Sequence, residues 1–240
     1  QNNLITSLKD ENPKKGINRV VWDLSYDSAN PLNLNKNDKV ENKKIKPGKT
    51  YEGLSEEIRP KVAPGKYKAR LSYNNVTEYS EILVSGDYRI KMPVENYKLK
   101  SEALVYLRDL QNRTHELIEN IVFIENQLEQ LAIKLKIVSS NDLTEIENLH
   151  DRINNFKEEH LMRPPPSMGY RQKPRLKEEI KTLMRAIDNT TNPPTIPQQE
   201  RIKSLKGELD KHLNTMKIFE ISIKEINSSH SSLPQIMLND

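Results

Sequence analysis

Residues 107–138 read LRDLQNRTHELIENIVFIENQLEQLAIKLKIV, and an apolar side chain recurs in them at every third or fourth position. Only Thr114 interrupts this series with a polar side chain. Such spacing, sustained over four heptads, is typical of helices that pack along a coiled-coil seam. It predicts a helix from about residue 97 to residue 138, roughly 60 Å long at 1.5 Å per residue. The predicted seam residues are Leu107, Leu117, Ile121, Ile124, Leu128 and Leu131.

Three more helices are expected after this one. Asp142, with Glu145 three residues later, is a capping-box pattern ahead of a second helix, which the prolines at 164–166 end. A third helix is predicted around residues 176–187, and a fourth begins near Pro197. Because the second and third are each about half as long as the others, we expect a long antiparallel helical bundle with one interrupted layer. The seam on the fourth helix comprises Leu209, Met216, Phe219 and Ile223.

The N-terminal part of the chain has the pattern of strands. Residues 17–24, INRVVWDL, are rich in β-branched and aromatic side chains. Residues 66–73 alternate strictly between polar and apolar, and Asn74-Asn75 leads into residues 76–84, which predicts a hairpin with one buried face. Trp22 is expected to anchor a core. The sequence therefore predicts an α+β protein with a small antiparallel β-sandwich over residues 1–95 and helices over residues 96–240.

The composition excludes several classes of function. The absence of cysteine excludes disulfides and zinc-cysteine sites. No apolar run approaches the roughly 18 residues that cross a bilayer, so no membrane insertion is expected. The formal net charge of +4 is concentrated in residues 33–50, which hold six lysines. No recognition helix or aromatic cluster accompanies them, so we expect a mobile, solvated loop and no nucleic-acid partner.

The residues that carry catalytic chemistry do not form a recognisable pattern. The histidines have no metal-ligand spacing, and His160 and His212 fall on seam positions, where a partly buried histidine is expected. No glycine-rich phosphate loop is present. We therefore expect no enzyme activity and no cofactor. An alternative is a carbohydrate-binding module with an exposed aromatic platform, and another is an enzyme subunit whose catalytic residues lie outside this chain. The candidate platform residues are Tyr26, Tyr51, Tyr67 and Tyr73.

Four motifs occur in an order that resembles a known arrangement. They are GINRVVWDL at 16–24, APGKYKARL at 63–71, NPPTIPQQ at 192–199 and EINSS at 225–229. In this order, with the long heptad helix, they resemble the C-terminal region of bacterial secreted, sortilin-like or sialidase-repeat-like β-propeller proteins, often labelled glycosyl hydrolases. The β part also resembles the immunoglobulin-like domain of the flagellar hook-capping protein. The structural signature consists of Arg19, Trp22, Asp23, Pro64, Gly65 and Tyr67.

The resemblance implies a location and a role. It implies an immunoglobulin-like sandwich in an exported bacterial protein, placed after a β-propeller domain of the same parent chain. The propeller would carry any enzymatic or binding activity, and this chain would be a non-catalytic docking domain and spacer. Its helices would offer a surface to another protein. We also expect that Gln1 is not the natural start of the polypeptide, because the chain begins without methionine.

Overall fold

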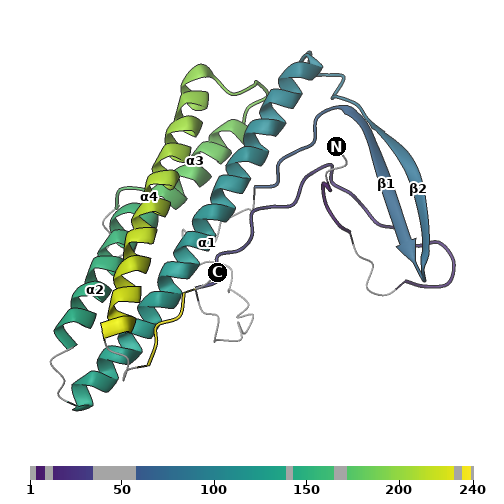
Figure 1. Ribbon diagram of the computed structural model, residues 1–240. Coiled ribbons are helices and arrows are strands. Elements are labelled where there is room, and N and C mark those ends of the chain that lie inside the picture. Colours follow the sequence, from purple (N-terminus) through teal and green to yellow (C-terminus); the bar gives the residue numbers. More distant parts are fainter. Residues whose placement is uncertain are drawn as a thin grey trace, which may run out of the picture. The chain divides into compact units, whose positions relative to one another are not determined.

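The computed structural model describes residues 4–8, 13–34, 58–138, 143–164, 172–229 and 234–238. From position 35 onward, the predicted basic loop lies outside these residues, as do Tyr51 and the capping residue Asp142. The described chain is mostly helical, with one small sheet (Figure 1). Its elements are β1 (Gly65–Tyr73), β2 (Val76–Val84), α1 (Val94–Val138), α2 (Leu143–Phe156), the π-helix η1 (Lys157–Leu161), α3 (Leu176–Asp188) and α4 (Ile196–Ser229).

The chain divides into two compact units, each drawn from separate stretches of sequence. Unit 1 consists of Gln1–Ala29, Glu56–Asp109 and Leu183–Gln199. Unit 2 consists of Asn30–Ser55, Leu110–Thr182 and Glu200–Asp240. The helices α1, α3 and α4 each contribute residues to both units. The domain boundary predicted between residues 95 and 96 stays a prediction.

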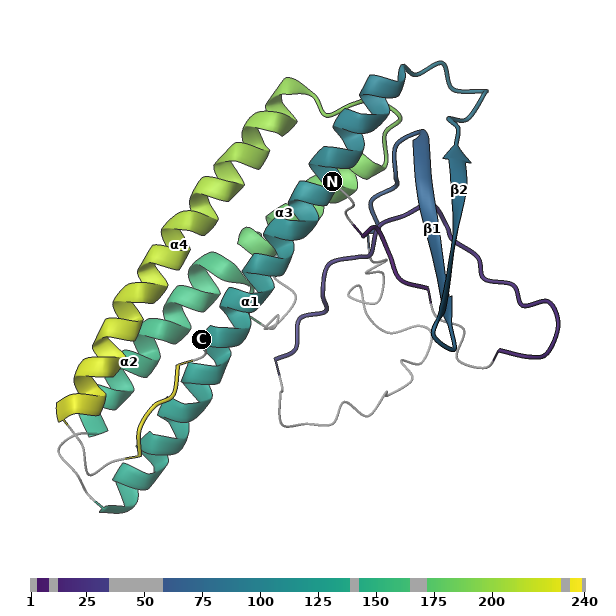
Figure 2. The same ribbon diagram turned by 45° about the vertical axis from the view of Figure 1, so that its right-hand side comes forward.

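Unit 2 is a bundle of the C-terminal part of α1, α2, the start of α3 and most of α4. Within it, α2 runs in the opposite direction to α1 and α4 (Figure 2). Thr114 is buried in this bundle and its hydroxyl donates a hydrogen bond of 2.8 Å to the carbonyl oxygen of Leu110, which satisfies the polar group within its own helix. The buried side chains of α1 here are Leu110, Leu117, Ile118, Ile121, Ile124, Leu128, Leu131, Ala132 and Leu135. Those of α4 are Leu205, Leu209, Met216, Phe219, Ile223 and Ile226.

Unit 1 contains the N-terminal part of α1, the C-terminal part of α3 and the hairpin. Leu107 of α1 and Ile187 of α3 are fully buried here. The Nζ of Lys100 donates to the carbonyl oxygens of Asp188 and Thr190, at 2.9 and 2.5 Å. Asp188 is the last residue of α3 and Thr190 lies two residues beyond it, where carbonyl oxygens lack intrahelical partners, so Lys100 ties the end of α3 to α1.

The predicted hairpin is present, and its turn explains its register. Asn74 and Asn75 both have positive φ, 44° and 65°, as a two-residue turn between antiparallel strands requires. The register pairs Tyr73 with Val76 and Gly65 with Val84. The expected burial of one face holds only for the half of β1 nearest Gly65, because the side chains at the turn end of both strands are exposed.

The predicted immunoglobulin-like β-sandwich is wrong. The described residues form a single sheet of two strands, and residues 17–24, predicted as a strand, have no regular structure. Leu24 has φ 59°, a left-handed conformation that ends an extended run, and the backbone beyond it makes only an isolated bridge between Ser25 and Lys61. Ile17 and Val21 are exposed, so this segment supplies no second layer. Only the coarse α+β class fits the chain, and coiled-coil packing stays a prediction.

The second predicted helix ends differently from what the sequence pattern predicts. The α-helix stops at Phe156 and continues as η1, so His160 lies in a π-turn rather than on a regular helical seam. The fourth helix begins as predicted, near Pro197. Its start is a capping box, in which the Gln198 N–H donates to Thr195 Oγ1 and the Thr195 N–H donates to Gln198 Oε1, at 3.4 and 2.9 Å.

Substituting Ile121 by Asp tests the core of unit 2. Ile121 is fully buried, so the variant places an unpaired charge among apolar side chains and we expect a loss of several kcal/mol of stability. Circular dichroism with thermal melting measures the loss of helix, and the fluorescence of Trp22 reports unit 1 separately. The matched control is Ile133→Asp on the same helix, where the side chain is 48% exposed and the melting temperature should change little. Equal melting of the two variants would contradict the assignment of the core.

Candidate interaction surface

The signature residues of the N-terminal part come together in unit 1, around the start of the hairpin. The rings of Trp22 and Tyr67 meet edge to face with centroids 5.7 Å apart, and both side chains are half-buried. The Trp22 Nε1–H donates to the carbonyl oxygen of Ser25 at 2.9 Å, and the Tyr67 hydroxyl donates to that of Ala63 at 2.5 Å. Trp22 is therefore a packing residue of a turn, and the described residues contain no sandwich core of the kind that it was expected to anchor.

Asp23 holds the turn in place through its carboxylate. Arg59 donates to Asp23 Oδ2 at 2.7 Å, the Ser25 N–H donates to Oδ1 at 3.2 Å, and Lys61 lies 3.9 Å away. Burial opposes ionisation, but the Ser25 hydrogen bonds and the charges of Lys61 and Arg59 outweigh it, so the pKa of Asp23 lies below its usual value. Asp23 thus has a structural role here.

The remaining signature residues are Pro64, Gly65 and Arg19. Pro64 and Gly65 are half-buried where β1 begins, and Gly65 is the first residue of that strand. Arg19 is exposed and has no polar partner in the described part of the chain.

The turn end of the hairpin exposes apolar side chains on one face. Leu71, Tyr73 and Val76 are 69%, 60% and 60% exposed, and they lie on the same face because Tyr73 pairs with Val76 and Leu71 with Glu78. We call Leu71, Tyr73 and Val76 the apolar tip. A shallow hollow of about 460 Å³ lies beside it, lined also by Asn74 and Glu78.

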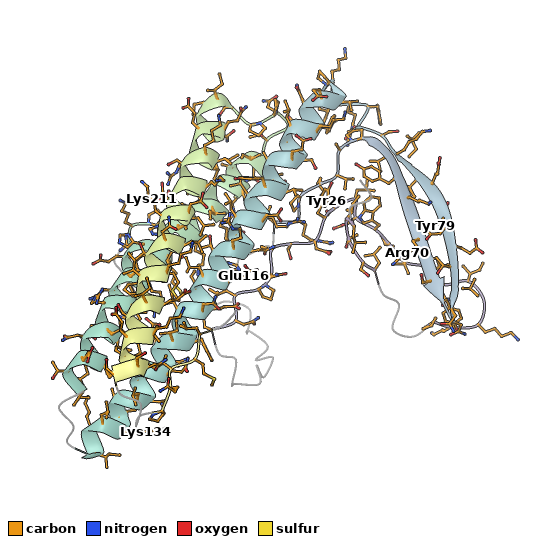
Figure 3. All side chains as sticks on the ribbon, in the orientation of Figure 1. Tyr26, Arg70, Tyr79, Glu116, Lys134 and Lys211 are labelled. Carbon is orange, nitrogen blue, oxygen red and sulfur yellow. The ribbon has the colours of Figure 1, made fainter. Side chains whose placement is uncertain are left out.

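The opposite face of the hairpin is more polar. Arg70 and Tyr79, labelled in Figure 3, are paired across the two strands on that face. The Lys68 ammonium lies 4.2 Å from the centre of the Tyr79 ring, which covers one side of that aromatic surface with a cation. The apolar tip is therefore the candidate interaction surface of unit 1.

The tyrosines predicted as a carbohydrate platform do not share one surface. Tyr67 is half-buried against Trp22, and its pKa is raised by that burial and by nearby Tyr26. Tyr26 is half-buried, with the Arg108 guanidinium 5.8 Å from its ring centre. Tyr51 lies outside the described residues. Tyr73, at the apolar tip, is the tyrosine of this set that the described structure leaves open to solvent.

In unit 2, an aromatic cluster joins η1 and the end of α2 to α4. The rings of His160 and His212 stack with centroids 5.3 Å apart, and Phe156 lies 5.5 Å from His160, His212 and Phe219. Burial and the neighbouring His160 lower the pKa of His212, and Glu208 opposes them. The expected seam role of His212 fits this placement, whereas His160 is exposed.

A buried ion pair fixes the start of η1 to α1, and sequence reasoning missed it. The Lys157 Nζ lies 2.6 Å from Glu125 Oε2, with both side chains largely buried. Burial raises the pKa of Glu125, although the hydrogen bond and charge of Lys157 oppose the rise. Glu125 Oε1 is buried without a partner in the described structure. The position of Glu125 in the sequence could have indicated its burial. It lies four residues after Ile121 and three before Leu128, so on a helix it lies next to the seam.

The predicted seam residues lie in the buried interior of the two units. Leu107 is buried in unit 1, and the others are buried in unit 2. They therefore contribute to folding rather than to a binding surface. The seam residues of unit 2 are Leu117, Ile121, Ile124, Leu128, Leu131, Leu209, Met216, Phe219 and Ile223.

No group of three or more His, Asp or Glu side chains lies close enough to hold a metal ion in the part of the chain that the structure describes. None of the described helices is long and apolar enough to cross a membrane.

Removing Lys157 tests the buried pair. Lys157→Met leaves the Glu125 carboxylate buried without its cation, so we expect a loss of about 3–5 kcal/mol in the free energy of unfolding. The double variant Glu125→Met, Lys157→Met should stay near the wild type, because no charge is left unpaired. The control is Lys136→Met, whose partner Glu147 is exposed, with an expected loss below about 1 kcal/mol. Chemical denaturation measures all three, and similar losses for the two single variants would refute a buried pair.

The histidine contribution to the stability of unit 2 should fall in mild acid. Because the pKa of folded His212 lies below 6.5, the unfolded chain binds more protons as the pH falls below 6.5, and stability present above that pH is lost. His115, whose burial also lowers its pKa, acts in the same direction. We expect His212→Phe to show a smaller loss between pH 7 and pH 5 than the wild type, measured by thermal melting. His150→Gln, outside the aromatic cluster, is the control and should follow the wild-type profile.

The chain matches no protein-family model, no curated protein and no solved structure. The resemblance to the C-terminal region of secreted propeller proteins therefore remains a proposal.

Proposed function

We propose that this chain is a non-catalytic docking and spacing module, in which the hairpin binds a β-structured partner through the apolar tip. The observation that carries the proposal is the exposure of Leu71, Tyr73 and Val76 on one face of a two-stranded sheet. A hairpin of two strands is marginally stable in water unless further strands or a helix cover it. A partner that covers this face would remove apolar surface from water and stabilise the hairpin together with the complex.

The form of the hairpin favours a β-structured partner. In the described structure, neither β1 nor β2 pairs with another strand on its outer side, so each leaves backbone N–H and C=O groups along an edge. A further strand can bind such an edge through main-chain hydrogen bonds, while the alternate side chains of the apolar tip give specificity. This mode of recognition uses extended backbone and apolar side chains together, which suits a partner made of sheets.

The helices support the spacing role. At 1.5 Å per residue, the 45 residues of α1 correspond to roughly 67 Å. In each of the two units, α1 buries apolar side chains at helical spacing. Long helical segments can act as semi-rigid spacers in place of flexible linkers.

The partner that we propose is a β-propeller domain of the same parent polypeptide, in an exported bacterial protein. The motif order at 16–24, 63–71 and 192–199 supports this, through its resemblance to the C-terminal region of secreted propeller proteins. Each blade of a propeller is a four-stranded sheet, and its short edge is the place where an open hairpin would add its strands. The propeller would carry any catalytic activity.

A pair of neighbouring substitutions tests the docking surface. Val76→Asp places a charge in the apolar tip, whereas Thr77→Asp places the same charge on the opposite face of the same strand. We expect Val76→Asp to weaken binding to the separately expressed propeller domain at least tenfold in isothermal titration calorimetry, and Thr77→Asp to change it less than threefold. Failure of the wild-type chain to bind, or equal effects of the two variants, would contradict the proposal.

A carbohydrate-binding role is the second candidate, and one observation favours it. Tyr73 is exposed beside Asn74 and Glu78, which line the same hollow. An aromatic face next to an amide and a carboxylate can stack on a sugar ring and bind its hydroxyl groups. A glycan array separates the two candidates, because specific glycan binding that is lost in Tyr73→Ala would favour this one over protein docking.

A further inference from the structure

Unit 2 has a groove along α1 that none of the preceding features uses. It is lined by two non-helical segments of the chain, Asn33–Leu34 and Pro234–Ile236, and has a volume of about 390 Å³. The α1 side chains that line it include Val122, Phe123, Asn126, Gln130 and Lys134. Both bordering segments are held by hydrogen bonds between helix side chains and their backbones. The geometry of those bonds indicates what the groove can bind.

The first segment is held by a ladder of polar side chains on α1. The Asn30 N–H donates to Asn112 Oδ1 at 2.7 Å, and the Asn33 N–H donates to Glu119 Oε1 at 2.8 Å. The His115 Nδ1 lies 2.7 Å from the Asn30 carbonyl oxygen, which can only accept, so Nδ1 carries the proton. From residue 30 to residue 33, an extended chain advances about 10 Å. From residue 112 to residue 119, the helix advances about 10.5 Å, so the spacing of the backbone groups matches the spacing of the helix side chains that bond them.

The second segment is held by side-chain amides, each of which bonds both the backbone N–H and the backbone C=O of one residue of the segment. Gln127 donates to the Met237 carbonyl oxygen at 3.0 Å and accepts from the Met237 N–H at 2.8 Å. Asn227 of α4 does the same with Ile236, at 2.9 Å in both directions. Such paired bonds involve the backbone of the bound segment and not its side chains, so they can hold an extended segment of almost any sequence.

The ladder on α1 continues beyond Glu119 into the groove. Asn126 lies seven residues after Glu119, Gln130 one turn further and Lys134 one turn beyond that. All three side chains are exposed and have no polar partner in the described part of the chain. Figure 3 labels Lys134 towards the C-terminal end of α1. The groove thus places two further amides, Asn126 and Gln130, one helical turn apart on α1 beside the apolar side chains of Val122 and Phe123.

We propose that this groove binds a third extended segment, a proline-containing stretch of a partner protein, with Asn126 and Gln130 bonding its backbone. Both segments that the chain itself places beside the groove contain proline, in NPLN at 30–33 and in PQI at 234–236. Proline favours extended conformations and lowers the entropy lost on binding. The groove floor from 119 to 134 is roughly 22 Å long, which fits about seven extended residues at 3.3 Å each.

Other occupants fit the groove less well. Glu119 and Lys134 give it one charge of each sign, so it lacks the positive field that a nucleic-acid strand requires. The groove is open, and its walls carry amides as well as apolar side chains, whereas sites for small apolar ligands are enclosed. An extended peptide has the alternating backbone polar groups and side chains that these walls match.

The test uses the full chain and a labelled synthetic peptide, SANPLNL, which copies residues 28–34. Fluorescence anisotropy should show saturable binding, and Asn126→Ala with Gln130→Ala should weaken it at least tenfold. Both residues are exposed, so circular dichroism should show an unchanged melting temperature. The matched control is Asn214→Ala, an exposed amide of α4 away from the groove, which should leave the affinity within twofold.

Three results would overturn the proposal. The first is no saturable binding of the peptide up to millimolar chain, which would mean that the groove is not a peptide site. The second is binding that the Asn126, Gln130 double variant leaves unchanged. The third is binding that depends on Asn112, measured with Asn112→Ala, since the peptide would then displace the chain's own segment at 30–33 instead of filling the groove.

Discussion

The burial of one apolar stripe along α1 is the constraint on which the helical structure depends. Leu110, Ile118, Ile121, Ile124 and Leu128 are almost fully buried, and at about 25 cal/mol per Å² of apolar surface each contributes a large share of the small net stability of a domain. Chains with few apolar residues can bury them efficiently in this way, because a helix concentrates them on one side. The polar faces that remain are then free to bind extended backbone, as Asn112 and Gln127 do.

In addition to this apolar burial, two contacts of polar side chains join η1 to neighbouring helices. Lys157 joins η1 to α1 through Glu125, and His160 joins it to His212 of α4. A π-turn widens the helix and changes which side chains face each neighbour, so that both contacts can be made within five residues. Lowering the pH changes the contributions of these two contacts to stability in opposite directions. Protonation of His212 disfavours the fold, whereas the raised pKa of Glu125 means that the fold favours its protonated form.

The two proposed binding surfaces share one physical principle. The apolar tip of the hairpin and the groove on α1 both offer hydrogen-bonding groups for an extended backbone beside a small apolar surface. In the hairpin these groups belong to the strand edges, and in the groove they are the side chains of Asn126 and Gln130. A module that binds extended segments at two places connects parts of an assembly, which agrees with the docking role proposed for unit 1.

The sequence by itself determined the features that repeat along the chain. The apolar spacing placed the long helix at Val94–Val138 within three residues of its start, and Asn74-Asn75 placed the hairpin turn, because both patterns depend on residues close in sequence. The tertiary structure decided the rest. Residues 17–24 have the composition of a strand, but a strand needs a partner, and Leu24 turns the chain into a left-handed conformation instead. The pairing of Glu125 with Lys157, the stacking of His160 on His212 and the groove beside Asn126 all join residues distant in sequence, so no local pattern specifies them.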